Sequence, residues 1–211
     1  EEIAQAIKDF QPEIILHMAA QPLVRDSYRD PLATYQTNVI GTLNVFEGAR
    51  KAGSVKAVLS VTTDKCYENK EQLQPYKEDD ALGGYDPYSS SKACAEILTS
   101  SYRRSFFEKE GIAVASARAG NVIGGGDFSV DRIIPDILRS IRAKKEVELR
   151  SPNAIRPWQH VLEPLNGYLL LTKNLYENHT AFSKAYNFGP NTDAEQNVET
   201  LTKTLIEKLG F

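Results

Sequence analysis

Short apolar runs alternate with longer amphipathic stretches along the first half of the chain. The apolar runs cover residues 14–18, 55–61 and 112–117. Short runs without polar alternation are typical of strands that are buried on both faces of a sheet. The amphipathic stretches predict a helix from Pro31 to near Gly53 and a second from Tyr88 to about Glu110, with Gly111 as its cap. This β-α-β-α-β order predicts an α/β fold built on a parallel sheet.

The second half of the chain has a weaker pattern. Helices are predicted at 131–143, 161–178 and 197–209, and short strands at 147–149 and 185–188. These elements predict a smaller α/β lobe over residues 121–211 that is partly interleaved with a core formed by residues 1–120. Within the core, residues 62–87 form a long polar connection, and a loop of that length in a compact domain is usually functional or mobile.

Two clusters of side chains can transfer protons. Tyr88 and Lys92 are four positions apart, so on a helix they share one face. The ammonium of Lys92 can then lower the pKa of the Tyr88 phenol, as a general base for a hydroxyl group requires. Thr63, Asp64 and Lys65 form the other cluster. Its acid and amine suit the elimination of water, because a hydroxyl is a poor leaving group until it is protonated.

The Tyr-x-x-x-Lys spacing by itself is a weak indicator of catalysis. The chain contains 10 tyrosines, so one such spacing is expected by chance. A surface tyrosine stacked on a lysine stem is the alternative interpretation. In the same way, Asn38 could be an ordinary exposed helix residue, Asn121 a turn residue and Arg156 an exposed arginine.

Composition restricts the classes of function. The chain has 211 residues and a formal net charge of −3, which argues against a general nucleic-acid binder. It contains no apolar stretch long enough to span a membrane and no signal-peptide pattern. Cys66 and Cys94 lie in unrelated contexts, which indicates a reducing compartment, and the three histidines lack the spacing of metal ligands. We therefore expect a cytoplasmic enzyme without a metal ion.

Six motifs follow one another along the chain. They are His-Met-Ala-Ala at 17–20, Thr-Asn-Val-Ile-Gly-Thr at 37–42, Val-Thr-Thr-Asp-Lys-Cys-Tyr at 61–67, Tyr-Asp-Pro-Tyr-Ser-Ser-Ser-Lys at 85–92, Arg-Ala-Gly-Asn-Val-Ile-Gly-Gly-Gly-Asp at 118–127 and Ile-Arg-Pro-Trp-Gln-His-Val at 155–161. Together they resemble the extended short-chain dehydrogenase/reductase family, and within it the nucleotide-sugar 4,6-dehydratases. Most of these enzymes carry Thr-Asp-Glu where this chain has Lys65. The lysine resembles the CDP-sugar branch, whose substrate is CDP-glucose.

The resemblance implies a Rossmann-like, doubly wound parallel sheet that binds NAD and a smaller lobe that binds the nucleotide sugar. It assigns catalysis to Thr63, Asp64, Lys65, Tyr88 and Lys92, cofactor binding to Ala19, Ala20, Asn38, Tyr88 and Lys92, and substrate binding to Arg118, Asn121, Arg132 and Arg156. It also implies a homodimer formed through a four-helix contact. The candidate helices are 31–53 and 88–110, so we expect an exposed apolar face on both.

The implied reaction converts CDP-glucose to CDP-4-keto-6-deoxyglucose. Tyr88 removes the proton of the sugar 4-hydroxyl while hydride passes from C4 to NAD+. Lys92 stabilises the phenolate, and Thr63 hydrogen-bonds the 4-oxygen. Lys65 then abstracts the C5 proton, Asp64 protonates the departing 6-hydroxyl, and hydride returns to C6. For Lys65 to act as the base, burial or the nearby Lys92 must depress its pKa.

One feature of the family is absent from the chain. The Gly-x-x-Gly-x-x-Gly fingerprint of the first βα turn does not occur, so we expect Glu1 to mark a truncated sequence. Two other functions stay open. A nucleotide-sugar epimerase or reductase would use Tyr88, Lys92 and Thr63 without needing the Asp-Lys pair. A fragment without its cofactor half would bind only a nucleotide sugar or a partner subunit.

Overall fold

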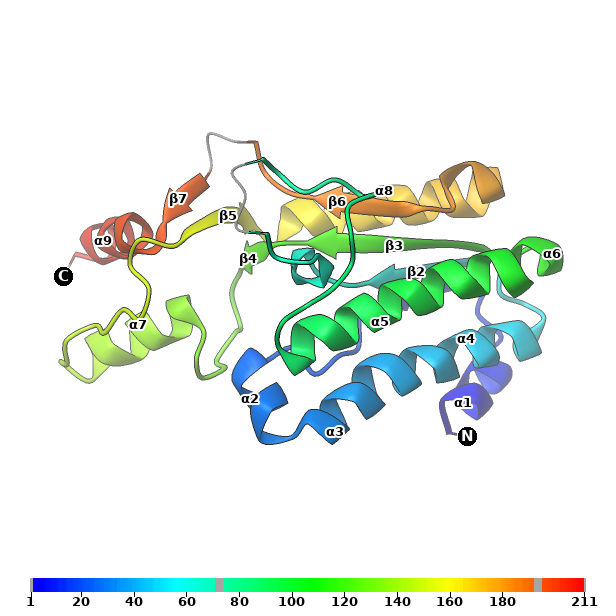
Figure 1. The fold of residues 1–211 in the computed structure, drawn as a ribbon, viewed down its shortest axis with the longest axis horizontal. Coiled ribbons are helices and arrows are strands. Elements are labelled where there is room, and N and C mark those ends of the chain that lie inside the picture. The colour runs from blue at the N-terminus through cyan, green and yellow to red at the C-terminus, as the bar shows by residue number, and fades with distance from the viewer. Residues whose placement is uncertain (1, 71–73, 192–194, 211) are drawn as a thin grey trace. The chain divides into compact units, whose positions relative to one another are not determined.

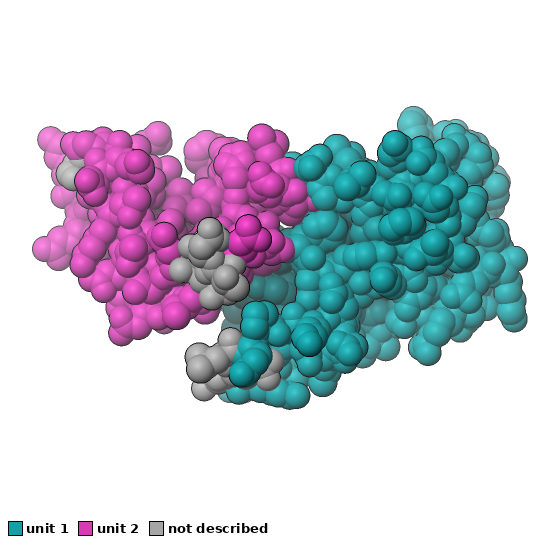
Figure 2. All heavy atoms as spheres, turned by 90° about the horizontal axis from the view of Figure 1, so that it is seen from above, with its two compact units in different colours: residues 1–119, 165–188 teal, residues 120–164, 189–211 magenta. Residues whose placement is uncertain are grey.

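The computed structural model describes residues 2–70, 74–191 and 195–210. Its contacts divide the chain into two compact units, which Figure 2 shows in different colours. The first unit contains Glu1–Ala119 and Leu165–Phe188, and the second contains Gly120–Pro164 and Gly189–Phe211. The first boundary lies next to residue 120, where we expected the core to end. The segment 165–188 belongs to the core unit, although the sequence pattern assigned it mainly to the smaller lobe.

Four parallel strands form the sheet of the first unit, in the order β1-β2-β3-β6 (Figure 1). Their bounds are β1 Ile14–His17, β2 Ala57–Val61, β3 Ala113–Ala119 and β6 Ala185–Phe188. This sheet confirms the predicted α/β fold. In a parallel sheet all carboxyl ends lie at one edge, so the residues that follow the strands come together there.

Helices cover both faces of this sheet (Figure 1). α4 (Gly41–Ala52) and α5 (Pro87–Tyr102) pack on one face around Phe46. α8 (Leu162–Asn178) packs on the other face, where Leu175 contacts the alanine-rich strand β3. All residues of β3 are buried. Burial on both faces explains why this strand is largely apolar, with Ser116 and Arg118 as its two polar residues.

Both long helices predicted for the first unit are present, and each contains one wide turn. The first consists of α3 (Pro31–Tyr35), the π-helical turn η1 (Gln36–Ile40) and α4. The second consists of α5, the π-helical turn η3 (Arg103–Phe107) and α6 (Glu108–Glu110), and Gly111 ends it with a φ of 71°. A π-helical turn accommodates one extra residue and is often found at a functional site.

Shorter elements complete the first unit. They are the helices α1 (Glu2–Phe10) and α2 (Val24–Arg29) and the 3-10 turns η2 (Asp64–Cys66) and η4 (His179–Phe182). Helix α2 was not predicted, because the sequence analysis placed no element between the apolar run at 14–18 and the helix that begins at Pro31. The buried Ser27 donates a hydrogen bond to the Val24 carbonyl inside this helix, and its six residues are too few for a visible amphipathic period. Across the described parts of the chain, no helix is both long and apolar enough to cross a membrane.

The second unit contains a three-stranded sheet of order β4-β5-β7. Its elements are β4 (Asn121–Ile123), β5 (Ile155–His160), β7 (Glu195–Asn197), α7 (Ile133–Arg142) and α9 (Val198–Lys208). Strand β5 runs parallel to β4 and antiparallel to β7. The two helices match predicted ones. The strand predicted at 147–149 is wrong, because no described strand pairs with these residues and they have no regular structure.

Candidate active site

The chain turns at the carboxyl edge of the sheet after β2 ends. Thr63 caps η2: its Oγ1 accepts a hydrogen bond from the Lys65 backbone N–H (3.3 Å) and donates one to Asp64 Oδ1 (3.1 Å). Thr63 is buried, whereas the side chains of Asp64 and Lys65 are 38% and 41% exposed. Asp64 Oδ1 and Lys65 Nζ are 3.8 Å apart. An acid and an amine therefore lie at the surface beside a buried hydroxyl group.

Helix α5 carries Tyr88 and Lys92 against this turn. Pro87 is its first residue, and the Asp86 carboxylate accepts hydrogen bonds from the backbone N–H (2.9 Å) and the Oγ (2.6 Å) of Ser89. Tyr88 and Lys92 are both buried, and η2 contacts α5. The structure thus brings the two clusters of the sequence to the same edge of the sheet.

The Lys92 amine is held at the end of β2. Its Nζ donates a hydrogen bond to the Val61 carbonyl (3.1 Å), and an ammonium has two further N–H groups to offer. Burial lowers the pKa of Lys92 to about 8, although the Glu96 carboxylate acts in the opposite direction. This amine therefore changes its charge close to neutral pH, unlike an exposed lysine.

His17 ends β1 at the same edge. Thr42 Oγ1 donates its one proton to the Asn38 carbonyl (2.7 Å), so His17 Nε2, at 2.9 Å, must be the donor to Thr42. Burial, together with the positive charge of Lys92, lowers the pKa of His17 to about 4. The imidazole is consequently neutral at pH 7 and adds no second positive charge beside Lys92.

Asn38 lies in the π-helical turn η1 and is 1% exposed. Its Oδ1 accepts a hydrogen bond from the Gln21 N–H (2.8 Å), and its Nδ2 donates to the Gln21 carbonyl (3.0 Å) and to Ser91 Oγ (2.9 Å). Ser91 Oγ in turn donates to the Tyr88 carbonyl (2.7 Å). Asn38 therefore joins the turn that follows β1 to the helix that carries Tyr88.

The same edge has groups that fit the nicotinamide ribose of a dinucleotide. Ala19 and Ala20 follow β1 with small side chains, Ala19 exposed and Ala20 partly buried, so a ligand can approach the backbone there. Lys92 has one described hydrogen bond, to Val61, and its other donors suit ribose hydroxyls. These residues could hold NAD, and Asn38 fixes the turn through its hydrogen bonds to the Gln21 backbone.

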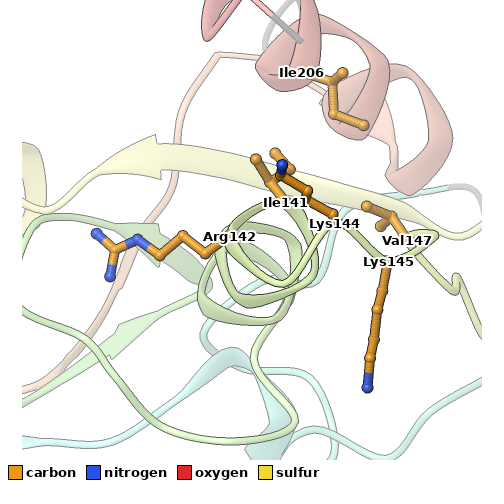
Figure 3. Close-up of a pocket in the computed structure, with 6 residues that line it drawn as sticks. All are labelled: Ile141, Arg142, Lys144, Lys145, Val147 and Ile206. Carbon is orange, nitrogen blue, oxygen red and sulfur yellow. The ribbon is translucent and has the colours of Figure 1, made fainter.

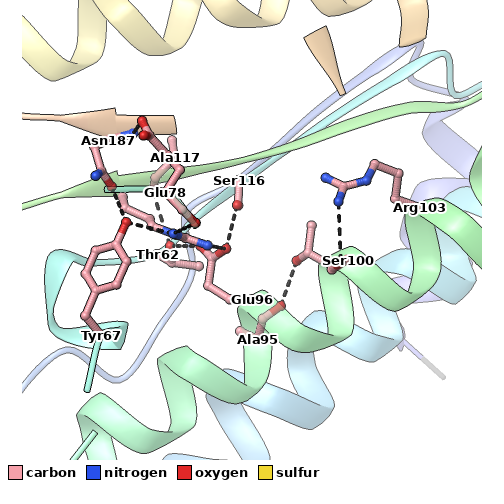
Figure 4. Close-up of polar contacts among 12 residues, drawn as sticks. Thr62, Tyr67, Glu78, Ala95, Glu96, Ser100, Arg103, Ser116, Ala117 and Asn187 are labelled. Atoms are coloured by element: carbon pink, nitrogen blue, oxygen red, sulfur yellow. Dashed lines mark hydrogen bonds and ion pairs between the residues drawn. The ribbon is translucent and has the colours of Figure 1, made fainter. Parts of the chain in front are cut away.

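Arg118 lies in a different environment from the one that the resemblance implies. The resemblance assigns it to the substrate, but it is 5% exposed and lies within β3. Its Nη2 pairs with Glu96 Oε2 at 2.7 Å, and its Nη1 donates to Tyr67 Oη (2.7 Å) and to the Glu78 carbonyl (3.0 Å). Figure 4 labels these three partners, Glu96, Tyr67 and Glu78. Both ends of the guanidinium fork are used inside the protein.

Three more substrate-binding candidates belong to the second unit. Asn121 begins β4, and its buried Oδ1 has no hydrogen-bond partner among the described residues. Arg156 is exposed in β5, where its Nη1 donates to the Ile155 carbonyl (2.8 Å), and Arg132 is exposed at the N-cap of α7. A buried acceptor without a donor is uncommon in folded proteins, so Asn121 is the strongest ligand-binding candidate of the three.

The second unit also has a hollow of about 530 Å³ beside the end of α7 (Figure 3). It is lined by Ile141, Arg142, Lys144, Lys145, Val147 and Ile206. In Figure 3, Arg142 and Lys145 extend away from the apolar side chains. Its lining includes none of the site residues predicted from the sequence, so we do not assign it to the candidate active site.

The sequence analysis missed two buried residues of α5, Ser91 and Glu96. Glu96 continues the spacing of four from Tyr88 through Lys92, so a carboxyl group on the buried face of a helix was a visible signal. Ser91 gave no signal, because its role depends on Asn38, which is 53 positions away in the chain.

Comparison with known proteins agrees with this geometry. The sequence model of a family described as "NAD dependent epimerase/dehydratase family" matches residues 1–189 of the chain. The chain belongs to this family. The parallel sheet of the first unit agrees with this membership.

Similar members of the family include two dehydratases from Salmonella typhimurium. The chain is 49% identical over 215 residues to CDP-glucose 4,6-dehydratase, with 100% of the chain and 60% of that protein covered. It is 28% identical over 178 residues to dTDP-glucose 4,6-dehydratase, with 76% of the chain and 48% of that protein covered. The chain thus spans about 60% of the length of the first of these relatives.

A solved structure gives the same picture of the fold. DesIV, a dTDP-glucose 4,6-dehydratase from Streptomyces venezuelae with NAD and TYD bound, superimposes with a TM-score of 0.84 at 25% identity. The superposition covers 99% of this chain and 60% of that chain. The Rossmann-like class expected from the sequence is therefore confirmed.

Proposed function

We propose that the protein containing this chain is an NAD-dependent CDP-glucose 4,6-dehydratase, a hydro-lyase. The observation that carries the proposal is the contact of the Thr63-Asp64-Lys65 turn with the helix of Tyr88 and Lys92. An acid and an amine then lie beside a base for a sugar hydroxyl. The 49% identity to CDP-glucose 4,6-dehydratase supports the reaction and favours cytidine diphosphate as the nucleotide.

Tyr88 and Lys92 carry the oxidation at C4. When bound, NAD supplies the acceptor for the C4 hydride and the donor for C6. Tyr88, as the phenolate, takes the proton of the 4-hydroxyl, and the Lys92 cation one turn away stabilises the phenolate. The Thr63 hydroxyl, which donates to Asp64 in this structure, turns to the sugar 4-oxygen. The result is a ketone at C4.

Asp64 and Lys65 carry the loss of water. The C4 ketone acidifies the C5 proton, which the Lys65 amine removes while the Asp64 carboxyl protonates the 6-hydroxyl. The ammonium formed on Lys65 then returns a proton to C5 as hydride reaches C6. Both groups must first be neutral. Asp64 Oδ1 and Lys65 Nζ are 3.8 Å apart, so in the proposed reaction one proton passes between the two groups when the substrate is bound. One proton transfer within the pair thus produces the acid and the base together.

Three residues stay our candidates for contacts to the nucleotide sugar. Asn121 offers a buried, unpaired oxygen to a donor of the ligand, and Arg132 and Arg156 offer guanidinium groups that suit a diphosphate. Arg118 is left out of this set, because its Nη1 and Nη2 already bind Glu96, Tyr67 and the Glu78 carbonyl. Only its Nε, which is buried, lacks a hydrogen-bond partner among the described residues.

The test is mass spectrometry of CDP-glucose after incubation with NAD+ and the full-length protein, with dTDP-, UDP- and GDP-glucose in parallel. Loss of one water from CDP-glucose alone supports the proposal. Loss from another nucleotide sugar keeps the dehydratase and corrects the nucleotide. No loss from any of the four overturns the dehydratase.

The double variant Asp64→Asn/Lys65→Met separates this proposal from the epimerase or reductase reading. It keeps Tyr88, Lys92 and Thr63, so oxidation at C4 remains possible while elimination of water does not. Complete loss of dehydration is the expected result. An unchanged conversion of the nucleotide sugar by this variant would favour the epimerase or reductase.

We also propose that the protein is a homodimer. Leu32 and Ile40, on the first long helix, are 67% and 48% exposed, and Ile97, on α5, is 58% exposed. Apolar side chains exposed on both long helices fit a contact in which each subunit contributes two helices.

A further inference from the structure

Glu96 is a charged residue that the proposed reaction does not use, although it is only 3% exposed. Its carboxylate accepts three side-chain hydrogen bonds (Figure 4). Thr62 Oγ1 donates to Oε1, and Ser116 Oγ and Arg118 Nη2 each donate to Oε2 at 2.7 Å. Thr62 follows β2, and the other two donors belong to β3. The side chain therefore fastens α5 to two neighbouring strands.

Arg118 balances the charge of Glu96 and extends the network. Its Nη1 donates a hydrogen bond to Tyr67 Oη, and the Tyr67 hydroxyl in turn donates a hydrogen bond to Asn187 Oδ1 (2.7 Å). Asn187 lies on β6. One set of hydrogen bonds, which ends at the exposed Asn187, thus connects α5 with the end of β2, with β3, with β6 and with the segment that follows the Thr63-Asp64-Lys65 turn.

The spacing along α5 relates Glu96 to the candidate active site. Tyr88, Lys92 and Glu96 follow at intervals of four, so all three lie along one face of the helix. Lys92 Nζ binds the Val61 carbonyl, and Glu96 binds the hydroxyl of Thr62. Two successive turns of α5 therefore hold two successive residues of the chain that leads into the catalytic turn.

A buried ion pair is a poor source of stability, because the loss of hydration offsets the attraction between the charges. Apolar residues of the same volume often serve stability equally well. What the charged network does supply is geometry, since three donors with defined directions allow the carboxylate only one position.

We propose that Glu96 is a positioning residue of the active site. Through Thr62, Ser116 and Arg118 it fixes the distance between the Tyr88-Lys92 pair and the Thr63-Asp64-Lys65 turn. The inference rests on the proposed function, because the distance matters only if both clusters act on one substrate. Reacting groups that move apart by about 1 Å slow a reaction by about 100-fold.

Glu96→Gln in the full-length protein is the first test. The amide keeps the shape of the side chain, but it removes the charge and adds a donor that opposes Arg118. We expect kcat for dehydration to fall about 10- to 100-fold, with KM for CDP-glucose changed less than about 3-fold. Glu96→Asp keeps the charge and restores part of kcat. Ser116→Ala removes one donor only and replaces Glu96→Gln if that variant does not fold.

Thr99→Val is the matched control. Thr99 is 1% exposed on the same helix, and its hydroxyl donates only to the Ala95 carbonyl (2.7 Å) among the described contacts. The change removes a buried hydroxyl from α5 without touching the residues before the catalytic turn. Wild-type kcat is expected, at a temperature where urea titration shows every variant to be folded. An equal loss of kcat in Thr99→Val overturns the inference.

Hydrogen exchange gives a reading that does not depend on activity. The amides of Lys65 and Cys66 are held by Thr63 Oγ1 and the Thr63 carbonyl, each at 3.3 Å. They are expected to exchange faster in Glu96→Gln than in Thr99→Val. Unchanged exchange in Glu96→Gln overturns the inference. If the full-length protein dehydrates no nucleotide sugar, the proposed function fails, and the exchange experiment still decides whether Glu96 positions this turn.

Discussion

Lys92 combines a buried position with a charge that burial opposes. Its pKa falls to about 8 from an ordinary value of 10.5, mainly because the ammonium loses its hydration. Below pH 8 the folded protein therefore carries a cation that the unfolded chain would hydrate better, and this lowers stability. A side chain that opposes folding at working pH is a strong functional candidate.

We predict that Lys92→Met raises the free energy of unfolding at pH 7 by up to about 3 kcal/mol and abolishes dehydration. Each unit by which the pKa of Lys92 falls below 10.5 corresponds to about 1.4 kcal/mol of lost stability while the side chain is charged. Between pH 8 and 10.5 the unfolded wild-type chain holds a proton that the folded one has lost, so wild-type stability rises. The advantage of the variant should fall to about half at pH 9.5. Urea titrations at both pH values measure it, and a variant less stable than wild type at pH 7 contradicts it.

His17 makes the stability of the protein depend on pH in the acidic range. Its pKa is about 4 in the folded protein and 6.5 in the unfolded chain, so the stability of the neutral form is lost as pH falls from 6.5 towards 4. When the pH is lowered from 7 to 4.5, the free energy of unfolding should fall in both proteins. We predict that the fall is about 2 to 3 kcal/mol smaller in His17→Asn than in wild type. His179→Asn, on an exposed turn, is the control. Parallel stability curves for wild type and His17→Asn would rule out this role.

At the level of elements, two helices begin in the same way. Asp30 accepts a hydrogen bond from the Ala33 N–H and Asp86 from the Ser89 N–H, each at 2.9 Å, and a proline follows each cap. The carboxylate accepts a hydrogen bond from a backbone N–H of the first turn that has no partner within the helix. Proline has no N–H and therefore needs no acceptor at this position. Only the second cap lies next to a catalytic candidate, Tyr88.

We predict that Asp30→Ala and Asp86→Ala each lower the free energy of unfolding by about 1 kcal/mol. Asp86→Ala should also lower kcat several-fold, because the first turn of α5 positions Tyr88. Asp30→Ala should leave kcat within about 2-fold, since α3 carries no catalytic candidate. Urea titration and steady-state kinetics on the full-length protein measure both quantities. Equal kcat values in the two variants would mean that the cap does not position Tyr88.

The sequence predicted the central strands β2 and β3 of the first unit because they are buried on both faces. A strand such as β3, buried on both faces, leaves a short and largely apolar run, and its short length favours a strand over a helix. Less of the second unit could be predicted from the sequence. Val147 and Leu149 alternate with glutamates as a strand would, but no described strand pairs with them. Strand β5 is largely polar and depends on pairing with β4 and β7, which sequence periodicity does not reveal.

Prediction of the site followed the same division between local and distant interactions. The spacing of Tyr88 and Lys92 and the Thr-Asp-Lys sequence are local patterns, so the sequence displayed them. The pairing of Arg118 with Glu96 joins residues 22 positions apart and depends on how α5 lies on β3. Without that packing, an arginine beside a glycine-rich segment looked like a substrate ligand. The role of a side chain that binds another side chain distant in the sequence cannot be predicted from a local motif.

On the scale of the whole molecule, the exposed apolar residues of the two long helices lead to a prediction about assembly. The full-length protein is expected to be a dimer that Ile97→Lys dissociates, because a lysine ammonium would lose its hydration inside an apolar contact. A central residue of such a contact contributes about 2 kcal/mol or more, so the dissociation constant should rise at least about 30-fold. Val130→Lys is the control, since Val130 is 55% exposed, close to the 58% of Ile97, and belongs to the second unit. Sedimentation velocity over a range of concentrations measures the change. A wild-type monomer, or a dimer that Ile97→Lys leaves intact, would exclude this contact.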